Sequence, residues 1–532
     1  MTTNTDTATD IPVSAPHAAD APERRRHYTT YNVAVILFMS IGSLSYGYSA
    51  SIISTTLGQP SFITYMKLDT ASNASALEGA ITSLYFVGGV FGTFLGSYVA
   101  DRWGRVRAIG LGAVLMVISG GLLAGSTAVA MFITFRFFSG MAGYILIAGV
   151  PLWIIEIVPP GSRGMLVDIH PAMFVFGYLV ACWTGVGFYY AHGSGGIQWR
   201  IPIAVQCAFP LILLCGLKWM PESPRFLISK DRTDEAWPVL KRLHNRPDDP
   251  DDHYAKAEFY QIKKQLELDR QLESSYLSLI TNKSYRKRLV YGSLWIFFIE
   301  SSGVLVIVTY ASTFYGLLGY GPAKQLSFTA GWMTISWASC VGACFTVDLF
   351  PRQITAGFGL LGCLVCLVVE SVLIALFVDQ AVPNEGALAA AVAMMFLFPV
   401  FFSFGLDGPT FIFLGEIYPN HLRSMGLNIG LAVHALTNVI WLAPCAAGLK
   451  AIGWKYFLPL ICVSFVGVVS IFWFYPDTRR LPLEEVAKIF GDDELVAVYQ
   501  RDLESVEMTD PKAFETEHVE IVAKRTEGEG VA

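Results

Sequence analysis

The chain has 532 residues, of which 53% are hydrophobic, 13% aromatic and only 15% charged. An ordinary soluble domain does not need this share of apolar residues to fill its core, so the composition excludes that class and indicates a membrane protein. The formal net charge is −6, and the basic residues lie in short loops between apolar runs. This charge distribution excludes a nucleic-acid-binding protein.

Residues 1–30 are polar and rich in Thr and Ala, which predicts a disordered N-terminal segment without a cleavable signal peptide. Apolar windows follow, each of about the 20 residues that a helix needs to cross the hydrocarbon core of a bilayer. They are 31–52, 79–99, 108–127, 129–155, 165–189, 201–220, 288–317, 326–347, 354–377, 388–415, 424–447 and 455–475. The sequence therefore predicts an all-α membrane protein with twelve transmembrane helices.

The windows fall into two groups of six, which predict an N-terminal bundle over 31–220 and a C-terminal bundle over 288–475. The segment 221–287 between them is charged and has few apolar positions, so we expect a helical linker on the cytoplasmic side. Arginines concentrate in the segments on the side of the two chain ends, which predicts cytoplasmic termini. Residues 476–532 are then a cytoplasmic tail.

Two charged motifs recur in the two halves of the chain. The pattern Glu-Ile-x-Pro-x-x-x-Arg occurs at 156–163 and again at 416–423, and the Asp-to-Arg segment 101–105 has a weaker counterpart at 348–352. Each copy lies where an apolar run meets a basic loop. Duplicated halves around a central site indicate a transporter.

Further motifs carry a resemblance to a known family. Residues 221–227 read Pro-Glu-Ser-Pro-Arg-Phe-Leu, residues 476–485 read Pro-Asp-Thr-Arg-Arg-Leu-Pro-Leu-Glu-Glu, and Arg136 precedes Gly140 in an Arg-x-x-x-Gly pattern. With the two repeats, these motifs make residues 31–490 resemble the sugar porter family of the major facilitator superfamily, in its fungal form. The resemblance implies two pseudo-symmetric six-helix bundles of the major facilitator fold, alternating access without covalent catalysis, a monomer, and placement in the plasma membrane.

Arginines beside helix ends can pair with carboxylates on neighbouring helices, and such pairs open readily only when a motion hydrates them. The resemblance implies that the motif residues form a latch, a set of contacts that holds the cytoplasmic helix ends together in the outward-facing state. The alternative for any single arginine is a purely topological anchor. The predicted latch residues are Asp101, Arg102, Gly104, Arg105, Arg136, Glu156, Arg163, Glu222, Arg225, Asp348, Arg352, Glu416 and Arg423.

The expected transport site departs from the family pattern. The resemblance leads us to expect two glutamines and an asparagine in the seventh span, but residues 299–305 read Ile-Glu-Ser-Ser-Gly-Val-Leu, so a carboxylate replaces an amide that would read sugar hydroxyls. For His170 and His434, a hydrogen bond between helices explains the residue as well as substrate binding does. The predicted substrate-binding residues are Glu300, Ser301, Phe411, His434, Asn438 and His170.

Proton coupling also departs from the family pattern. Proton-coupled relatives carry an acid directly after Gly-Tyr in the first span, whereas this chain has Gly47-Tyr48-Ser49, so Arg136 lacks that partner. Either the protein is a facilitator, or coupling has moved to another deep carboxylate, since ionisable groups inside the membrane mark transport pathways. The predicted coupling residues are Glu300, Asp407 and Asp168.

The sequence thus predicts a secondary transporter of a sugar or a sugar-like small polar metabolite. A transporter of a non-sugar specialised metabolite or a hydroxy acid is one alternative, and a non-transporting nutrient receptor is another that the short tail disfavours. No motif for a metal, a phosphate or a nucleophile stands out, so we expect no cofactor, no metal and no enzyme activity. The expected partners are a small-molecule substrate, membrane lipid and protons, without nucleic acid.

Overall fold

The computed structural model describes residues 29–158, 166–191, 196–244, 252–270, 272, 275–346, 349–377, 385–477 and 490. The predicted latch residues Arg163 and Asp348 lie outside these ranges, as do residues 1–28 of the predicted N-terminal segment and nearly all of the predicted tail. Within the described ranges, every element of regular secondary structure is a helix.

The first half of the chain crosses the long dimension of the molecule six times. Its helices are α1 (Thr30–Met39), α2 (Ile41–Leu57), α3 (Pro60–Tyr65), α4 (Ala74–Trp103), α5 (Arg105–Ala124), α6 (Val129–Ile157), α8 (Ile169–Tyr189), α9 (Ile197–Val205), α10 (Ala208–Gly216) and η2 (Leu217–Trp219). Helices α1 and α2 together form the first crossing, and α9, α10 and η2 form the sixth.

The linker and the second half are also helical. The linker helices are α11 (Pro224–Ser229), α12 (Thr233–Leu243), α13 (His253–Asp269) and α14 (Tyr276–Thr281). The helices that follow are α15 (Lys283–Glu300), α16 (Val304–Leu317), α17 (Pro322–Thr346), α18 (Arg352–Phe377), α19 (Glu385–Phe402), η3 (Ser403–Asp407), α20 (Gly408–Glu416), η4 (Asn420–Leu422), α21 (Arg423–Leu442), α22 (Cys445–Ile452), η5 (Gly453–Tyr456) and α23 (Phe457–Phe474).

The number of membrane crossings follows from helix length and hydropathy. Ten helical segments in the described part of the chain are long and apolar enough to cross a membrane. The longest, Arg423–Phe474, has 52 residues and contains α21 and α23 as two crossings joined by α22 and η5. Helix α17 is less apolar, but its 25 residues suffice for a crossing at a rise of about 1.5 Å per residue. The prediction of twelve transmembrane helices is therefore confirmed.

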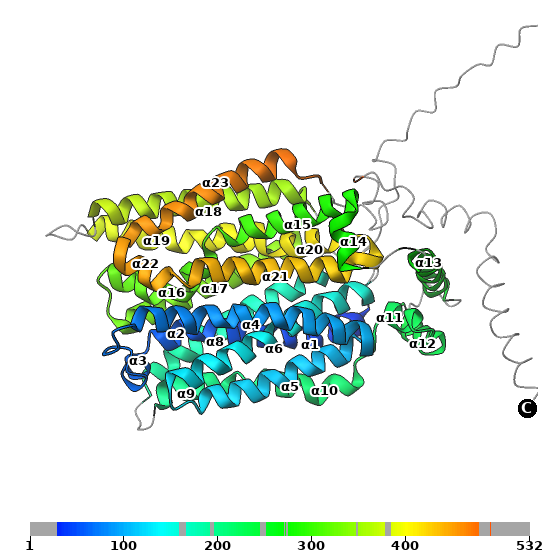
Figure 1. The fold of residues 1–532 in the computed structure, drawn as a ribbon, viewed down its shortest axis with the longest axis horizontal. Helices are drawn as coiled ribbons and strands as arrows, with labels where there is room; N and C mark the ends of the chain where they lie inside the picture. Colours follow the sequence, from blue (N-terminus) through cyan, green and yellow to red (C-terminus); the bar gives the residue numbers. More distant parts are fainter. Residues whose placement is uncertain are drawn as a thin grey trace, which may run out of the picture.

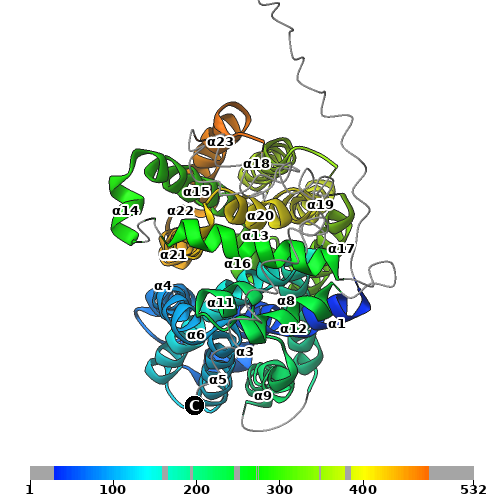
Figure 2. The same ribbon diagram turned by 90° about the vertical axis from the view of Figure 1, so that its right-hand side faces the viewer.

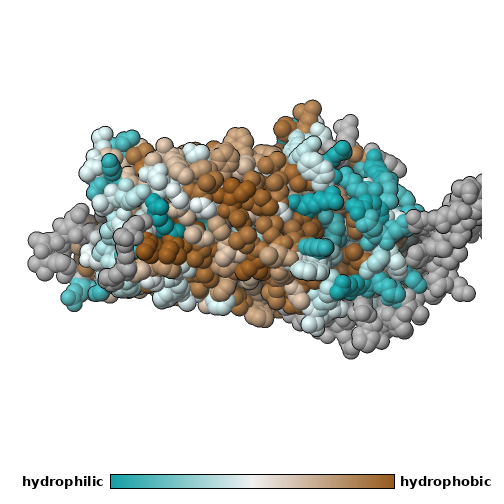
Figure 3. All heavy atoms as spheres, turned by 90° about the horizontal axis from the view of Figure 1, so that it is seen from below, coloured by the Kyte–Doolittle hydropathy of each residue, from teal (hydrophilic) through white to brown (hydrophobic). Residues whose placement is uncertain are grey.

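The helices form two layers of parallel rods. Helices α15 to α23 lie above α1 to α10 in Figure 1, and the end-on view in Figure 2 separates the same two bundles. Helices α11, α12 and α13 gather at one end, which we call the linker end, whereas α3 and α22 lie at the far end. A brown apolar band separates hydrophilic residues at the two ends in Figure 3, as expected for a protein that spans a bilayer.

The most extensive contacts between the two bundles join α8 with α17, α4 with α21, and α2 with α16. Toward the far end the contact is tight, because Ser54 Oγ donates a hydrogen bond of 2.7 Å to the carbonyl oxygen of Val308. At Gly79, an added Cβ would lie only 2.4 Å from the carbonyl oxygen of Ala443. The far end of the interface is therefore closed in this conformation.

Two crossings of the second bundle are interrupted partway. Between α15 and α16 the chain leaves the helix at Ser301 and Ser302, and Gly303 adopts a φ of +86°, which favours glycine. Between α19 and α20 the chain forms the π-helical turn η3, with Pro399 and Pro409 on either side. Interrupted membrane helices and π-turns frequently occur at functional sites, so these two breaks locate the candidate site.

Candidate functional site

The first break places Glu300 at the C-terminal end of α15, where it is buried between the bundles. Asn438 on α21 donates a hydrogen bond of 3.1 Å from Nδ2 to Oε2 of Glu300. The same Nδ2 donates to the carbonyl oxygen of His434 at 2.8 Å, which fixes the orientation of the amide. The structure therefore brings the predicted residues Glu300, His434 and Asn438 together.

His434 connects this cluster to the first bundle. Its Nε2 lies 3.4 Å from Oε1 of Glu300, and its Nδ1 lies 2.6 Å from the hydroxyl oxygen of Tyr144 on α6. If the tyrosine donates to Nδ1, the ring proton of a neutral imidazole is on Nε2 and faces the carboxylate. Tyr144, His434, Glu300 and Asn438 form what we call the central cluster, which spans both bundles.

Ser301 lies next to the central cluster but its hydroxyl is already engaged. The indole Nε1 of Trp441 donates to Ser301 Oγ at 3.1 Å, and Ser464 Oγ donates to the Ser301 carbonyl oxygen at 3.2 Å. These bonds satisfy backbone and side-chain groups that the break after α15 leaves without helical partners. Ser301 therefore supports the position of Glu300.

His170 and Phe411, the other two predicted substrate-binding residues, face each other across the bundle interface. Their ring centroids are 5.1 Å apart, with His170 on α8 and Phe411 on α20. Nδ1 of His170 lies 2.7 Å from the hydroxyl oxygen of Ser43, whereas its buried Nε2 has no hydrogen-bond partner in the described chain. His170 thus forms the hydrogen bond between helices that a purely structural role requires, but through only one of its two ring nitrogens.

Aromatic rings connect the two groups of predicted residues. Phe174 contacts Phe411 at 5.9 Å and Tyr46 at 6.2 Å between ring centroids, and Tyr46 contacts Tyr144 at 5.7 Å. Tyr144 in turn contacts the ring of His434 at 5.7 Å. The region between the bundles therefore combines aromatic surface with a few polar groups, which is the usual composition of a small-molecule site.

The two aspartates predicted for proton coupling lie at the second break. Asp407 is the last residue of η3 and is buried. Asp168, just before α8, packs against the start of α20, since a Cβ at Gly408 would lie 2.9 Å from both of its carboxylate oxygens. One acid from each bundle thus meets at the π-turn, beside but outside the central cluster.

Arg136 lies in the interior of the first bundle, and the structure does not bring it to the other predicted latch residues. Its Nη1 donates a hydrogen bond of 2.9 Å to the carbonyl oxygen of Ser49, and its guanidinium lies 4.3 Å from the ring centroid of Tyr85. In the described chain it forms no ion pair with a carboxylate, as the absence of an acid at Ser49 led us to expect. A backbone carbonyl and an aromatic face provide its partners instead.

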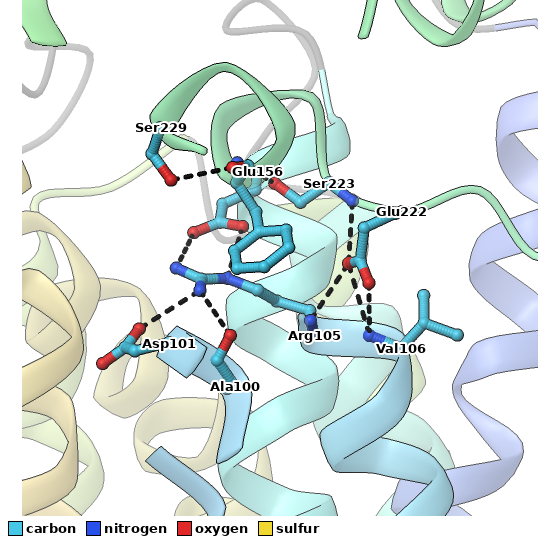
Figure 4. A network of polar contacts seen from close by, with 9 residues as sticks. Ala100, Asp101, Arg105, Val106, Glu156, Glu222, Ser223 and Ser229 are labelled. Atoms are coloured by element: carbon cyan, nitrogen blue, oxygen red, sulfur yellow. Dashed lines mark hydrogen bonds and ion pairs between the residues drawn. The ribbon is translucent and has the colours of Figure 1, made fainter. Parts of the chain in front are cut away.

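Three predicted latch residues of the first bundle, Asp101, Arg105 and Glu156, form one network at the linker end (Figure 4). Arg105 donates to both carboxylate oxygens of Glu156 at 3.0 Å, to Asp101 at 3.1 Å and to the carbonyl oxygen of Ala100 at 2.9 Å. This bidentate geometry is specific to arginine and ties α4, α5 and α6 together. Arg102, by contrast, is exposed and makes no ion pair in the described chain.

Glu222 completes the network by capping a helix. Its carboxylate accepts hydrogen bonds from the backbone N–H groups of Arg105 at 3.0 Å and Val106 at 3.3 Å, which are free donors at the start of α5. Gly104 makes room for the Glu222 carboxylate, since a Cβ at this position would lie 2.3 Å from Glu222 Oε2. Its φ of +114° also favours glycine. Burial raises the pKa of Glu222, although the three backbone N–H donors around it oppose this shift.

The second bundle contains a matching pair. Nη2 of Arg352 lies 3.7 Å from Oε1 of Glu416, which joins α18 to α20. These residues occupy the repeat positions of Arg105 and Glu156, so the repeated motif corresponds to a repeated contact. Each of the two ion pairs joins helices of a single bundle. The latch prediction did not specify whether its contacts lie within a bundle or between bundles.

The two bundles and the linker enclose a cavity of about 620 Å³ at the linker end. Asp101, Arg105 and Glu156 line it from the first bundle, while the predicted latch residues Arg225 and Arg423 line it from the linker side and the second bundle. The linker end thus contains a cavity lined by charged residues, whereas the far end of the interface is closed.

One contact connects the linker helix α13 to the second bundle across this cavity. His421 Nδ1 lies 3.8 Å from Asp269 Oδ1. Burial, together with the positive charge of Arg288, lowers the pKa of His421 to about 4. The imidazole is therefore neutral near pH 7, and its contact with Asp269 is not a full ion pair.

Sequence reasoning missed the aromatic members of the site. Tyr144, Tyr46 and Phe174 lie inside long apolar runs, where nothing in the spacing separates them from ordinary core residues. A hydroxyl group inside a membrane span was the available signal, because a buried tyrosine oxygen needs a hydrogen-bond partner.

Comparisons with known proteins place the chain among transporters. The profile of the family described as Sugar (and other) transporter matches residues 35–490. The MFS-type transporter criB of Aspergillus cristatus is 28% identical over 86% of this chain and 92% of its own length. The sugar transporter STL1 of Saccharomyces cerevisiae is 27% identical over 88% of this chain and 83% of its own length. A probable quinate permease of Aspergillus fumigatus is 26% identical over 86% of this chain and 88% of its own length.

Solved structures confirm the fold. The proton:xylose symporter XylE bound to 6-bromo-6-deoxy-D-glucose superimposes with a TM-score of 0.76 at 23% identity, over 87% of this chain and 100% of that chain. An inward open conformation of the xylose transporter XylE from E. coli gives a TM-score of 0.68 at 22% identity, over 86% and 100%. The predicted major facilitator fold of two six-helix bundles is therefore correct.

Proposed function

Since the chain belongs to the family of sugar and other transporters, we propose that it moves a small hydroxylated metabolite, of the sugar or polyol kind, across a membrane by alternating access. One observation carries the proposal. The central cluster joins Tyr144 of the first bundle to His434 and Glu300 of the second at an interrupted crossing. Polar groups that converge between two mobile bundles can bind a hydroxylated substrate and change their contacts as the bundles move.

The charges at the two ends support an orientation. The linker end carries Arg102, Arg105 and Arg225, and basic residues next to membrane spans favour the cytoplasmic side. Both termini are then cytoplasmic, and the cavity of about 620 Å³ lies on the cytoplasmic side. The plasma membrane is the proposed location, where such a transporter meets external metabolites.

Protons are the proposed coupling ion. Ser49 offers Arg136 only a carbonyl oxygen, so coupling requires a different acid. Asp407 is the favoured candidate because it is buried at the π-turn and next to the partner bundle, with Glu300 and Asp168 as the other acids of the pathway. A carboxylate in this setting is costly in its charged form, so a proton or a cation must accompany it through the transport cycle.

The ion pairs at the linker end are the proposed latch. Arg105 with Glu156, and Arg352 with Glu416, each hold helix ends of one bundle in fixed geometry. Bundles that are rigid at this end move as units, which is what alternating access requires. Arg423 and Arg225, which line the cavity between the bundles, are placed to hold or release the closed state as the cavity opens.

A hydroxy acid or a specialised metabolite remains the second candidate substrate. It is favoured by the name of one relative, a probable quinate permease.

The test is uptake into proteoliposomes that contain the purified full-length protein. The panel contains radiolabelled hexoses, pentoses, linear polyols and hydroxy acids, each measured with and without an inward proton gradient. Uptake of a hexose or polyol above protein-free liposomes supports the proposal. Uptake of hydroxy acids alone supports the second candidate, and binding without any uptake supports the receptor alternative.

A further inference from the structure

Hydrogen-bond donors surround the carboxylate of Glu300. The amide of Asn438 is held in one orientation by the carbonyl oxygen of His434, so the group that faces Oε2 is an N–H donor. Oε1 faces Nε2 of His434, which carries the ring proton when the Tyr144 hydroxyl donates to Nδ1. Oε2 thus accepts a hydrogen bond and Oε1 faces a ring nitrogen that can carry a proton, an arrangement that suits a charged carboxylate.

In the described part of the chain, no lysine or arginine forms an ion pair with Glu300. In the part of the chain that the structure describes, neither Glu300 nor Asp407 forms an ion pair with a lysine or an arginine. Arg136 is the buried guanidinium of the first bundle, but Ser49 and the ring of Tyr85 already occupy it. The described part of the chain therefore holds two buried carboxylates, Glu300 and Asp407, without a lysine or arginine partner.

Aromatic rings border the same region. Tyr46, Tyr144, Phe174 and Phe411 form a continuous series of ring contacts that leads from His434 to His170. Aromatic faces attract cations, and they do so most strongly where water is excluded. A carboxylate with donors around it and aromatic rings beside it is the chemistry that recognises a protonated amine.

We infer that the central site takes a hydroxylated substrate that carries a protonated amine, which binds to Glu300, and that it rejects substrates that carry a carboxylate. The inference rests on the proposed function, since it names the substrate class of the same site. The amine provides the positive partner that the protein lacks, and the hydroxyl groups can bind Tyr144, His434 and Asn438. Glu300 then binds the substrate, and Asp407 is the residue that takes up the coupled proton.

The experiment measures binding to the purified full-length protein with two series of matched compounds. The first is D-glucosamine, D-glucose and D-glucuronate, and the second, for a smaller site, is serinol, glycerol and glycerate. At about pH 6 the amines are protonated and the carboxylates are ionised. The parent protein is compared with Glu300→Gln, which keeps the shape of the side chain, and with Glu370→Gln. Glu370 is also a buried carboxylate of the second bundle, but it faces a separate pocket between α16, α18 and α19.

In at least one series, the amine should bind about tenfold tighter than the neutral compound, which corresponds to one charge-assisted contact, and the carboxylate should bind weakest. Glu300→Gln should abolish this preference, and Glu370→Gln should keep it. The inference is overturned if no amine binds in either series, if neutral compounds bind as tightly as the amines in both, or if Glu300→Gln keeps the preference. Uptake of neutral sugars without an amine preference would overturn it while the proposed function stands, whereas failure of the proposed function would appear as the absence of uptake of any sugar or polyol.

Discussion

Tyr144 and His434 come from opposite bundles and are joined by a hydrogen bond of 2.6 Å between the tyrosine hydroxyl and ring Nδ1. The bond crosses the surface along which the bundles must move, so it can persist only in conformations that bring α6 and α21 together. It also determines which nitrogen of His434 faces Glu300, since the two ring nitrogens have complementary roles. One hydroxyl group thus links the conformation of the transporter to the state of its central carboxylate.

The first prediction concerns this hydroxyl. Tyr144→Phe keeps the ring contacts with Tyr46 and removes the bond to His434, whose net contribution is about 0.5–1.5 kcal/mol. We expect about a two- to tenfold loss of transport at limiting substrate, with unchanged insertion. Tyr98→Phe is the control, because Tyr98 is exposed on α4 and its hydroxyl makes no hydrogen bond in the described chain. Equal uptake by both variants would exclude a role for the bond.

The second prediction concerns the latch of the first bundle. Arg105→Ala leaves Glu156 buried without its bidentate partner, and loss of one member of a buried pair costs about 3–5 kcal/mol. We expect a lower midpoint of thermal unfolding and impaired uptake at equal surface abundance. Arg102→Ala, three positions away in the same motif, removes an exposed arginine and should change neither. A parent-like Arg105→Ala variant would show that this arginine is only a topological anchor.

The architecture could be predicted because each membrane span appears in the sequence as a continuous run of about 20 apolar residues. The predicted windows 108–127 and 129–155 correspond to α5, which ends at Ala124, and to α6, which begins at Val129. The repeated Glu and Arg positions likewise predicted the contacts of Arg105 and Arg352 within their bundles. Signals of this kind depend on neighbouring residues or on short spacings, which the sequence displays directly.

The candidate site could be predicted only in part. Glu300, His434 and Asn438 were recognisable as polar residues in apolar spans, and they do meet. Their contact with Tyr144 depends on how the two bundles pack, which no local pattern specifies. For the same reason, no local pattern showed that Arg136 lies apart from the other latch residues, since its place depends on the packing of α2 and α4 around α6.

The third prediction tests the cap on α5. Gly104→Ala forces a side chain into a backbone conformation that costs about 1–3 kcal/mol, and its Cβ would collide with Glu222. We expect lower thermal stability and weaker transport. Gly121→Ala on the same helix is the matched control, since its Cβ would meet nothing within 4 Å and alanine favours a helix. If Gly104→Ala were as stable as Gly121→Ala, the approach of Glu222 to the start of α5 would not be required.

The last prediction concerns energy coupling at the second break. Asp407 is buried in the π-turn beside Asp168 of the opposite bundle, and its charged form is costly there unless it takes up a proton. Asp407→Asn keeps the size of the side chain and removes the proton site. We expect it to retain exchange of labelled for unlabelled substrate across the liposome membrane, because exchange needs only the substrate-bound steps, and to lose accumulation driven by a proton gradient. Glu370→Gln should keep both activities. If the parent never accumulates substrate above the external concentration under an imposed gradient, the protein is a facilitator, and Asp407 serves binding or structure.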